Sequence, residues 1–179
     1  DINTDEDHPL AGQVDALTNA NIIFCCGLLG LSLPKTVYYL EQVISADAYS
    51  SESRFSLSPH YLIYLLSRAY ADGGIKLLHK VMPTMQDYIL SQLPAPHAEK
   101  SILNLACLAV SLLNMKVPSI LIRPYLVPLL TEQQKDGGWP VSVAYMTPSL
   151  TENDTNHYNG SAALTTAIAI EALYKYYIE

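Results

Sequence analysis

The acidic and imidazole side chains near the start of the chain could bind a metal ion or a diphosphate. The chain opens DINTDEDH, which places Asp5, Glu6 and Asp7 next to His8. Carboxylate oxygens are the preferred ligands of hard divalent cations, so this run is a candidate site. Acidic runs of this kind are also typical of solvated segments, and that alternative stays open. We therefore treat residues 1–10 as a separate acidic segment.

A second candidate pair is Asp154 and His157, three residues apart in a polar stretch. With a third ligand such as His60 they could hold a metal ion. Neither this pair nor the acidic opening has a complete ligand set at a known spacing. The sequence therefore predicts no metal ion and no cofactor.

Tyrosine is the abundant aromatic residue, with 13 copies against 2 of phenylalanine. Tyrosine rings can line a cavity and stabilise a positive charge in a bound molecule. Tyr61, Tyr64 and Arg68 are spaced so that they share one face of a helix. Together with Tyr145 and Tyr158 they form the predicted substrate-binding set. The alternative is that these hydroxyl groups mark the edge of the hydrophobic core.

The elements that must position these side chains are predicted to be helices, because no convincing period-two pattern of a strand is present. Three segments are apolar on nearly every side: 14–29, 101–114 and 160–173. Four others have a polar face: 34–44, 59–71, 75–93 and 119–134. Alternation of the two kinds predicts an all-α fold with two helical layers, the inner one covered on most sides.

Composition limits the class of protein. The 179 residues fit one domain, and 17 acidic against 10 basic residues give a net charge of −7. No cluster of lysine and arginine occurs along the chain, which excludes the footprint of a nucleic-acid-binding protein and disfavours an anionic membrane surface. Cys25, Cys26 and Cys107 fit neither a disulfide framework nor a zinc spacing, so we expect small buried side chains.

One segment has the length of a membrane span, because residues 16–34 contain no charged side chain. Asn19 and Asn21 near its start, and Gly30 and Pro34 near its end, favour a buried helix with a clear stop. The acidic opening also lacks the basic residues of a signal peptide. We therefore expect a cytoplasmic protein with no transmembrane segment.

A distinctive motif lies at residues 124–140, PYLVPLLTEQQKDGGWP, which contains Gln133, Asp136, Gly138 and Trp139. Two glycines permit a tight turn there, and the indole N–H of a buried tryptophan needs an acceptor. This segment resembles the QW repeat of squalene and hopene cyclases and the related helix-pair repeat of protein prenyltransferases. The following segment, NHYNGSAALTTAIAIEAL, resembles the inner helix after such a repeat, and residues 58–74 resemble it more weakly.

The resemblance implies an α/α toroid and, in the cyclases, protonation of the substrate by the middle Asp of a DxDD motif. The nearest segment here is Gln13-Val14-Asp15-Ala16, so Asp15 is the candidate catalytic acid. A carboxylate at a helix start, favoured by the helix dipole, is the alternative. Zinc is not implied, because the Cys that would accompany Asp136 in the prenyltransferase pattern is missing.

The length of the chain sets how much of a toroid it can form. A closed toroid of this family has twelve helices, and at roughly 20 to 25 residues per helix and loop the chain supplies about half. We therefore expect residues 11–179 to form a partial toroid. It could be a fragment of a longer protein, associate with itself or a partner, or stand as an open arc with an exposed apolar groove. The predicted function is to bind or cyclise an isoprenoid or other long apolar substrate by protonation. The alternatives are a non-catalytic helical-repeat module for protein or lipid binding, and an enzyme that reuses the scaffold.

Overall fold

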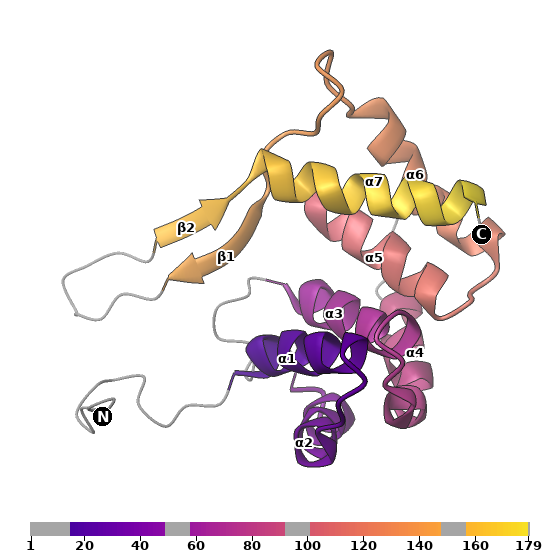
Figure 1. The fold of residues 1–179 in the computed structure, drawn as a ribbon. Helices are drawn as coiled ribbons and strands as arrows, with labels where there is room; N and C mark the ends of the chain where they lie inside the picture. Colours follow the sequence, from indigo (N-terminus) through magenta and orange to yellow (C-terminus); the bar gives the residue numbers. More distant parts are fainter. Residues whose placement is uncertain (1–14, 49–57, 92–100, 148–156, 179) are drawn as a thin grey trace.

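The computed structural model describes residues 15–48, 58–91, 101–147 and 157–178. These residues are mostly helical, with one small two-stranded sheet (Figure 1). The elements are α1 (Ala16–Leu28), α2 (Pro34–Ser45), α3 (Pro59–Ala71), the 3-10 helix η1 (Lys76–Lys80), α4 (Met82–Ser91), α5 (Ile102–Asn114), α6 (Ser119–Thr131), β1 (Val143–Thr147), β2 (His157–Gly160) and α7 (Ala162–Ile178). The acidic segment 1–10 and Asp154 lie outside the described residues.

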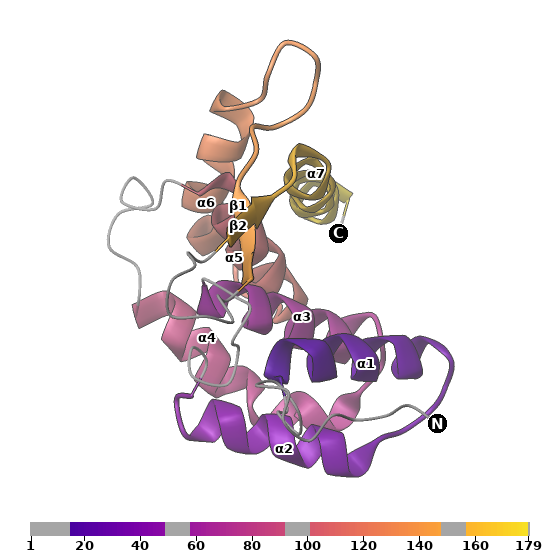
Figure 2. The ribbon, with the colours of Figure 1, turned by 90° about the vertical axis from the view of Figure 1, so that its left-hand side faces the viewer.

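The odd-numbered helices form one layer. Helices α1, α3, α5 and α7 pack side by side in this order, with α1 and α7 nearest the viewer and α3 and α5 behind them (Figure 1). After a quarter turn the same four helices are again arranged as an arc (Figure 2). Close contacts between their later turns, such as Gly27 with Gly73 and Asn114 with Lys175, show that the ends of neighbouring helices lie together. The arc therefore has one edge of helix starts and one edge of helix ends.

The even-numbered helices return the chain and cover the outside of this layer. Helix α2 packs on α1 and α6 packs on α5, while η1 and α4 contact both α2 and α3. No helix in the described ranges is both long and apolar enough to cross a bilayer.

Local sequence explains where the inner helices begin. Asp15, Ser58 and Ser101 are the N-caps of α1, α3 and α5, and each side chain accepts a hydrogen bond from a backbone N–H in the first turn. Such caps satisfy N–H groups that have no partner inside the helix. Helix α5 is then buried along almost its whole length, as its all-round apolar sequence predicts.

Three expectations need correction. The segment 75–93 is not one helix, because η1 ends at Lys80 and α4 begins at Met82. The fold is not purely helical, since β1 and β2 form an antiparallel pair. The pair is short and its second strand has no aliphatic side chain, so it shows no apolar alternation. Helix α7 extends to Ile178 and is not covered all round: it exposes a face that includes Ile170.

Candidate functional site

Tyr61, Tyr64 and Arg68 come together on α3, as their spacing predicts. The rings of Tyr61 and Tyr64 are stacked, with centroids 5.8 Å apart and planes 17° from parallel. Arg68 Nη1 donates a hydrogen bond of 3.1 Å to the hydroxyl oxygen of Tyr64. Helix α3 begins at a fixed residue because Ser58 caps it and Pro59 occupies its first turn, where proline is tolerated. That start determines which side chains face the inside of the arc.

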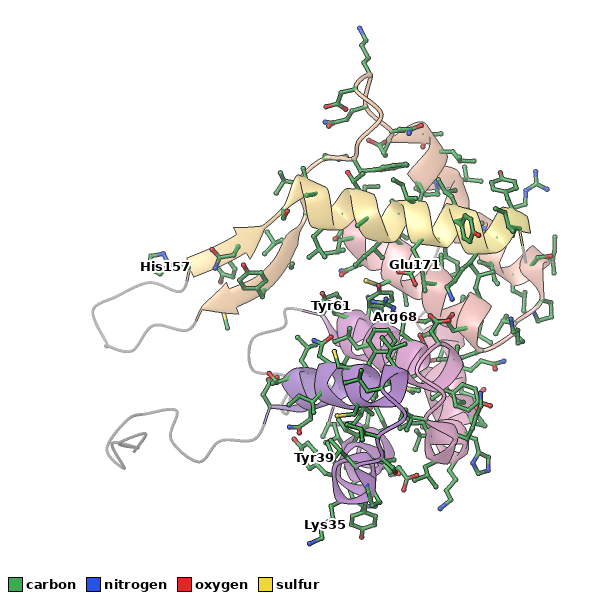
Figure 3. All side chains as sticks on the ribbon, in the orientation of Figure 1. Lys35, Tyr39, Tyr61, Arg68, His157 and Glu171 are labelled. Carbon is green, nitrogen blue, oxygen red and sulfur yellow. The ribbon has the colours of Figure 1, made fainter. Side chains whose placement is uncertain are left out.

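Glu171 of α7 and Phe24 of α1 complete this group. The Tyr64 hydroxyl donates to Glu171 Oε2 at 2.8 Å, and Arg68 Nε lies 3.6 Å from Glu171 Oε1. The guanidinium of Arg68 also lies over the ring of Phe24, 4.5 Å from its centroid. Figure 3 shows Tyr61, Arg68 and Glu171 in the space between α1 and α7. We call Phe24, Tyr61, Tyr64, Arg68 and Glu171 the inner cluster.

Burial governs the protonation of the inner cluster. Burial, and then the charge of Glu171, raises the pKa of the Tyr64 hydroxyl far above its ordinary value, although Arg68 acts in the opposite direction. Burial also raises the pKa of Tyr61 and of the neighbouring Cys107 thiol. These phenols and this thiol are therefore neutral at physiological pH. They can pack and donate hydrogen bonds, but they are poor nucleophiles.

A second polar contact joins α7 to α3 one turn further on. Lys175 Nζ lies 3.1 Å from Asp72 Oδ1 and donates a 2.9 Å hydrogen bond to Asn114 Oδ1 of α5. The Asn114 amide in turn donates to Ser67 Oγ at 3.1 Å, and Ser67 donates to the carbonyl of Tyr64. Two oppositely charged pairs therefore span α5, and they hold the arc at its observed curvature.

A cavity of about 370 Å³ opens at the helix starts beside Tyr61. Its walls come from the first turns of α3 and α5 and from the start of β1. Leu103, Val141, Val143 and Ala144 provide apolar surface, and the remaining five lining residues carry polar groups: Ser58, Tyr61, Ser101, Asn104 and Ser142. The cavity is therefore mixed in character, and its volume lies in the range of small-molecule sites, which begins at about 300 Å³.

Asp15 occupies a different position from the inner cluster. Its Oδ1 accepts the backbone N–H of Thr18 at 2.7 Å, which makes it the N-cap of α1. Its Oδ2 is buried and has no hydrogen-bond partner among the described residues. Asp15 lines neither the cavity beside Tyr61 nor a second cavity near Gly27. The structure thus gives this carboxylate a capping role, and a catalytic role stays a prediction.

The QW-like segment forms a corner between α6 and β1. The indole N–H of the buried Trp139 donates to the carbonyl of Leu129 at 2.7 Å, and its backbone N–H donates to Thr166 Oγ1 of α7 at 3.0 Å. Gln133 Nε2 donates to the carbonyl of Gly137 within the turn. The tryptophan thus ties α6 to α7, whereas the glutamine closes its own turn.

Two further residues of the same turn support this corner. Asp136 Oδ1 accepts the backbone N–H of Gly138 at 3.0 Å. Gly137 has a φ of 88°, which favours glycine. The four predicted motif residues are therefore structural neighbours in one turn.

The other predicted substrate residues lie apart from the inner cluster. Tyr145 of β1 and Tyr158 of β2 are both exposed and line neither of the two cavities. His157 begins β2 and projects from the hairpin, well away from Tyr61 and Arg68 (Figure 3). Within the ranges that the structure describes, no three His, Cys, Asp or Glu side chains are grouped as metal ligands would be.

Sequence reasoning missed Glu171, Lys175 and Phe24 as partners of the predicted residues. Glu171 and Lys175 are the charged residues of an otherwise uncharged α7, and this contrast is the signal that could have identified them. Phe24 carried no comparable signal, because its segment is apolar throughout. No known protein family, curated protein or solved structure matches this chain.

Proposed function

We propose that this chain is part of an α/α toroid of the cyclase and prenyltransferase kind and that it binds an isoprenoid or another long apolar molecule. The cavity beside Tyr61 carries the proposal, because four aliphatic side chains and the ring of Tyr61 offer surface for an apolar molecule, and hydroxyl groups beside them could bind its polar end. The ordered alternation of inner and outer helices and the corner at Trp139 support the toroid part.

Binding without cyclisation is the form of this function that the geometry favours. A protonating acid must reach the substrate in a site from which water is excluded. Asp15 instead accepts a backbone N–H of its own helix, where the helix N-terminus stabilises a negative charge. Glu171 is already paired with Tyr64 and Arg68. Neither carboxylate lines the cavity beside Tyr61.

Titration with farnesol, followed by isothermal calorimetry, tests this function. Val143→Trp places a large ring at the cavity wall and is expected to weaken binding by at least about tenfold. Val127→Trp makes the same substitution at an exposed position of α6 outside the cavity and serves as the matched control. Absence of farnesol binding to the folded wild type, or equal weakening by both variants, would contradict the proposal.

The protonation route has its own test. Farnesol and squalene are incubated with wild type and with Asp15→Asn, and the products are separated by gas chromatography. We expect no cyclic product from either protein. A cyclic product from the wild type that Asp15→Asn abolishes would establish Asp15 as the acid and refute binding without cyclisation.

A second candidate is a helical-repeat module that pairs with a second copy of itself. Its supporting observation is the exposed face of α7, which carries no charged side chain and includes Ala163, Ala167, Ile170 and Tyr174. Alanines one turn apart permit close approach of another helix. Light scattering after gel filtration tests this: a dimer that Ile170→Glu converts to a monomer supports the pairing, and a monomeric wild type refutes it.

A further inference from the structure

Large apolar side chains are exposed at the edge where the inner helices end. Leu28, Leu29 and Leu31, in the turn between α1 and α2, are 60%, 74% and 56% exposed. Leu77 of η1, Ile120 of α6 and Ile178 of α7 are exposed as well. Contiguous exposed apolar surface is costly in water and marks a place of interaction.

Backbone geometry brings the first two turns of this edge together. A Cβ on Gly27 would clash with the carbonyl oxygen of Gly73, so α1 and α3 touch at their ends through glycine. A cavity of about 380 Å³ lies between the turns that follow, and its lining includes Leu31, Lys76 and Leu77. Residues far apart in sequence thus form one surface.

The turns of α5 and α7 end at the same edge. Lys175, near the end of α7, binds both Asn114 at the end of α5 and Asp72 at the end of α3. We name residues 28–35, 72–80, 115–123 and 175–178 the basic edge.

Charge at the basic edge is mostly positive. Its exposed cationic side chains are Lys35, Lys76, Lys80, Lys116 and Arg123. Asp72 is the one acidic residue within these four ranges, and Lys175 pairs with it. The basic edge is thus positive, although the whole chain carries −7. The sequence shows no basic cluster because these cations come from separate turns.

Four of the seven other described acids lie toward the opposite edge, whereas Glu41, Asp87 and Glu171 lie within α2, α4 and α7. Asp15 caps the start of α1, Asp47 follows the end of α2, and Glu132 and Asp136 follow the end of α6. Because the even-numbered helices return the chain, their ends lie with the starts of the inner helices. The two edges of the arc therefore carry opposite charge.

Helix dipoles account for only part of this pattern. Cations are stabilised near helix C-termini, and Lys76 Nζ indeed lies 3.4 Å from the carbonyl oxygen of Tyr70. The dipoles do not account for leucines that are exposed between the cations. Exposed leucines ringed by lysines match the acyl boundary and the anionic headgroups of a membrane surface.

We propose that the basic edge docks this chain onto the surface of an anionic lipid bilayer. The leucines of the α1–α2 turn and Leu77 enter the acyl boundary, and the lysines contact the headgroups. This proposal is independent of the apolar ligand, because it uses the helix ends and not the cavity beside Tyr61.

Flotation with vesicles tests the docking. The probes are vesicles of phosphatidylcholine alone and of phosphatidylcholine with about a third phosphatidylserine. We expect wild type to float with the anionic vesicles and to be released by high salt. Each lysine at such a surface changes the binding constant about fivefold, so Lys35→Gln, Lys76→Gln and Lys80→Gln together lower it roughly 100-fold. Leu29→Ser lowers it about tenfold.

Matched controls lie away from the edge. Lys135→Gln removes one exposed charge beyond α6, as Lys80→Gln does at the edge, and Val127→Ser removes an exposed aliphatic group of α6, as Leu29→Ser does in the α1–α2 turn. The controls are expected to bind as wild type does, and circular dichroism verifies that every variant is folded.

Four outcomes overturn the proposal. The first is that folded wild type does not float with anionic vesicles, and the second is that it binds neutral vesicles equally well. The third is that a control substitution weakens vesicle binding as much as its matched variant does. The fourth is that wild type binds no vesicles but forms a dimer that Leu29→Ser dissociates. The last outcome assigns the edge to a second copy of the chain. None of these outcomes bears on farnesol binding, which is measured without lipid.

Discussion

Replacement of Lys175 by methionine removes the ammonium group that joins α7 to α3 and α5. Lys175 is a suitable target because its side chain is only 11% exposed and its Nζ donates to Asn114 Oδ1 at 2.9 Å. Methionine keeps the unbranched shape of the chain, so the packing against α5 is retained. The substitution therefore isolates the polar contacts from the apolar ones.

Lys175→Met has two opposing effects on the free energy of unfolding: it removes polar contacts, and it removes a buried charge. A hydrogen bond from a charged donor contributes about 2 kcal/mol, and Asn114 Oδ1 is left buried without its donor. The ion pair adds less than about 1 kcal/mol, because the Asp72 side chain is 38% exposed and screened by water. Relief of the ammonium from burial offsets part of this loss. We expect Lys175→Met to lower the free energy of unfolding by about 2 kcal/mol and Tm by about 6 °C.

Urea denaturation followed by circular dichroism and by Trp139 fluorescence measures this effect, since Trp139 contacts Thr166 of α7. Lys35→Met, in the exposed first turn of α2, is the control and is expected to change stability by less than about 0.5 kcal/mol. The double variant Lys175→Met with Asn114→Leu is expected to recover part of the lost stability, because it no longer buries Asn114 Oδ1 without a hydrogen-bond donor. A Lys175→Met protein as stable as wild type would refute the idea that these contacts hold the arc.

Four further outcomes follow from the described contacts. Gly27→Ala is expected to lower the free energy of unfolding by at least about 2 kcal/mol in urea, because its Cβ would meet the Gly73 carbonyl. Asp15→Ala removes the cap of α1 and costs about 1 kcal/mol, whereas Asp15→Asn, also a good cap, costs less; a thermal melt compares them. Trp139→Phe leaves a buried carbonyl of α6 without its donor and lowers stability by about 1 to 2 kcal/mol in urea. Burial raises the pKa of Tyr125 to about 12, so the folded state keeps a proton that the unfolded state releases. Stability is then constant below pH 10 and falls between pH 10 and about 12; Tyr125→Phe is expected to reduce this fall in alkaline urea titrations.

Local patterns predicted the helices and the α3 face well. Tyr61, Tyr64 and Arg68 needed only the period of one helix, so their grouping followed from spacing. The same holds for the caps Ser58 and Ser101, whose side chains act within one turn. Features of this kind depend on neighbours in sequence and require no knowledge of the fold.

Contacts between distant segments could not be predicted in this way. Glu171 meets Tyr64 across 107 positions of sequence, and only the order and direction of the inner helices bring them together. The basic edge could not be predicted for the same reason, since each of its turns supplies only one or two cationic side chains and the fold brings the turns together. Asp15 shows what a local pattern leaves open: the sequence offered both a catalytic acid and a helix cap, and the structure shows the cap.

The two charged pairs across α5 also fix the alignment of α7 against α3. Along α3 the order is Arg68 then Asp72, and along α7 it is Glu171 then Lys175, each one turn apart. A slip of α7 by one turn in either direction would set like charges opposite each other, Arg68 against Lys175 or Asp72 against Glu171. Apolar helices rich in alanine slide past one another at little cost, so the four charges select one register among several that the apolar packing alone would tolerate.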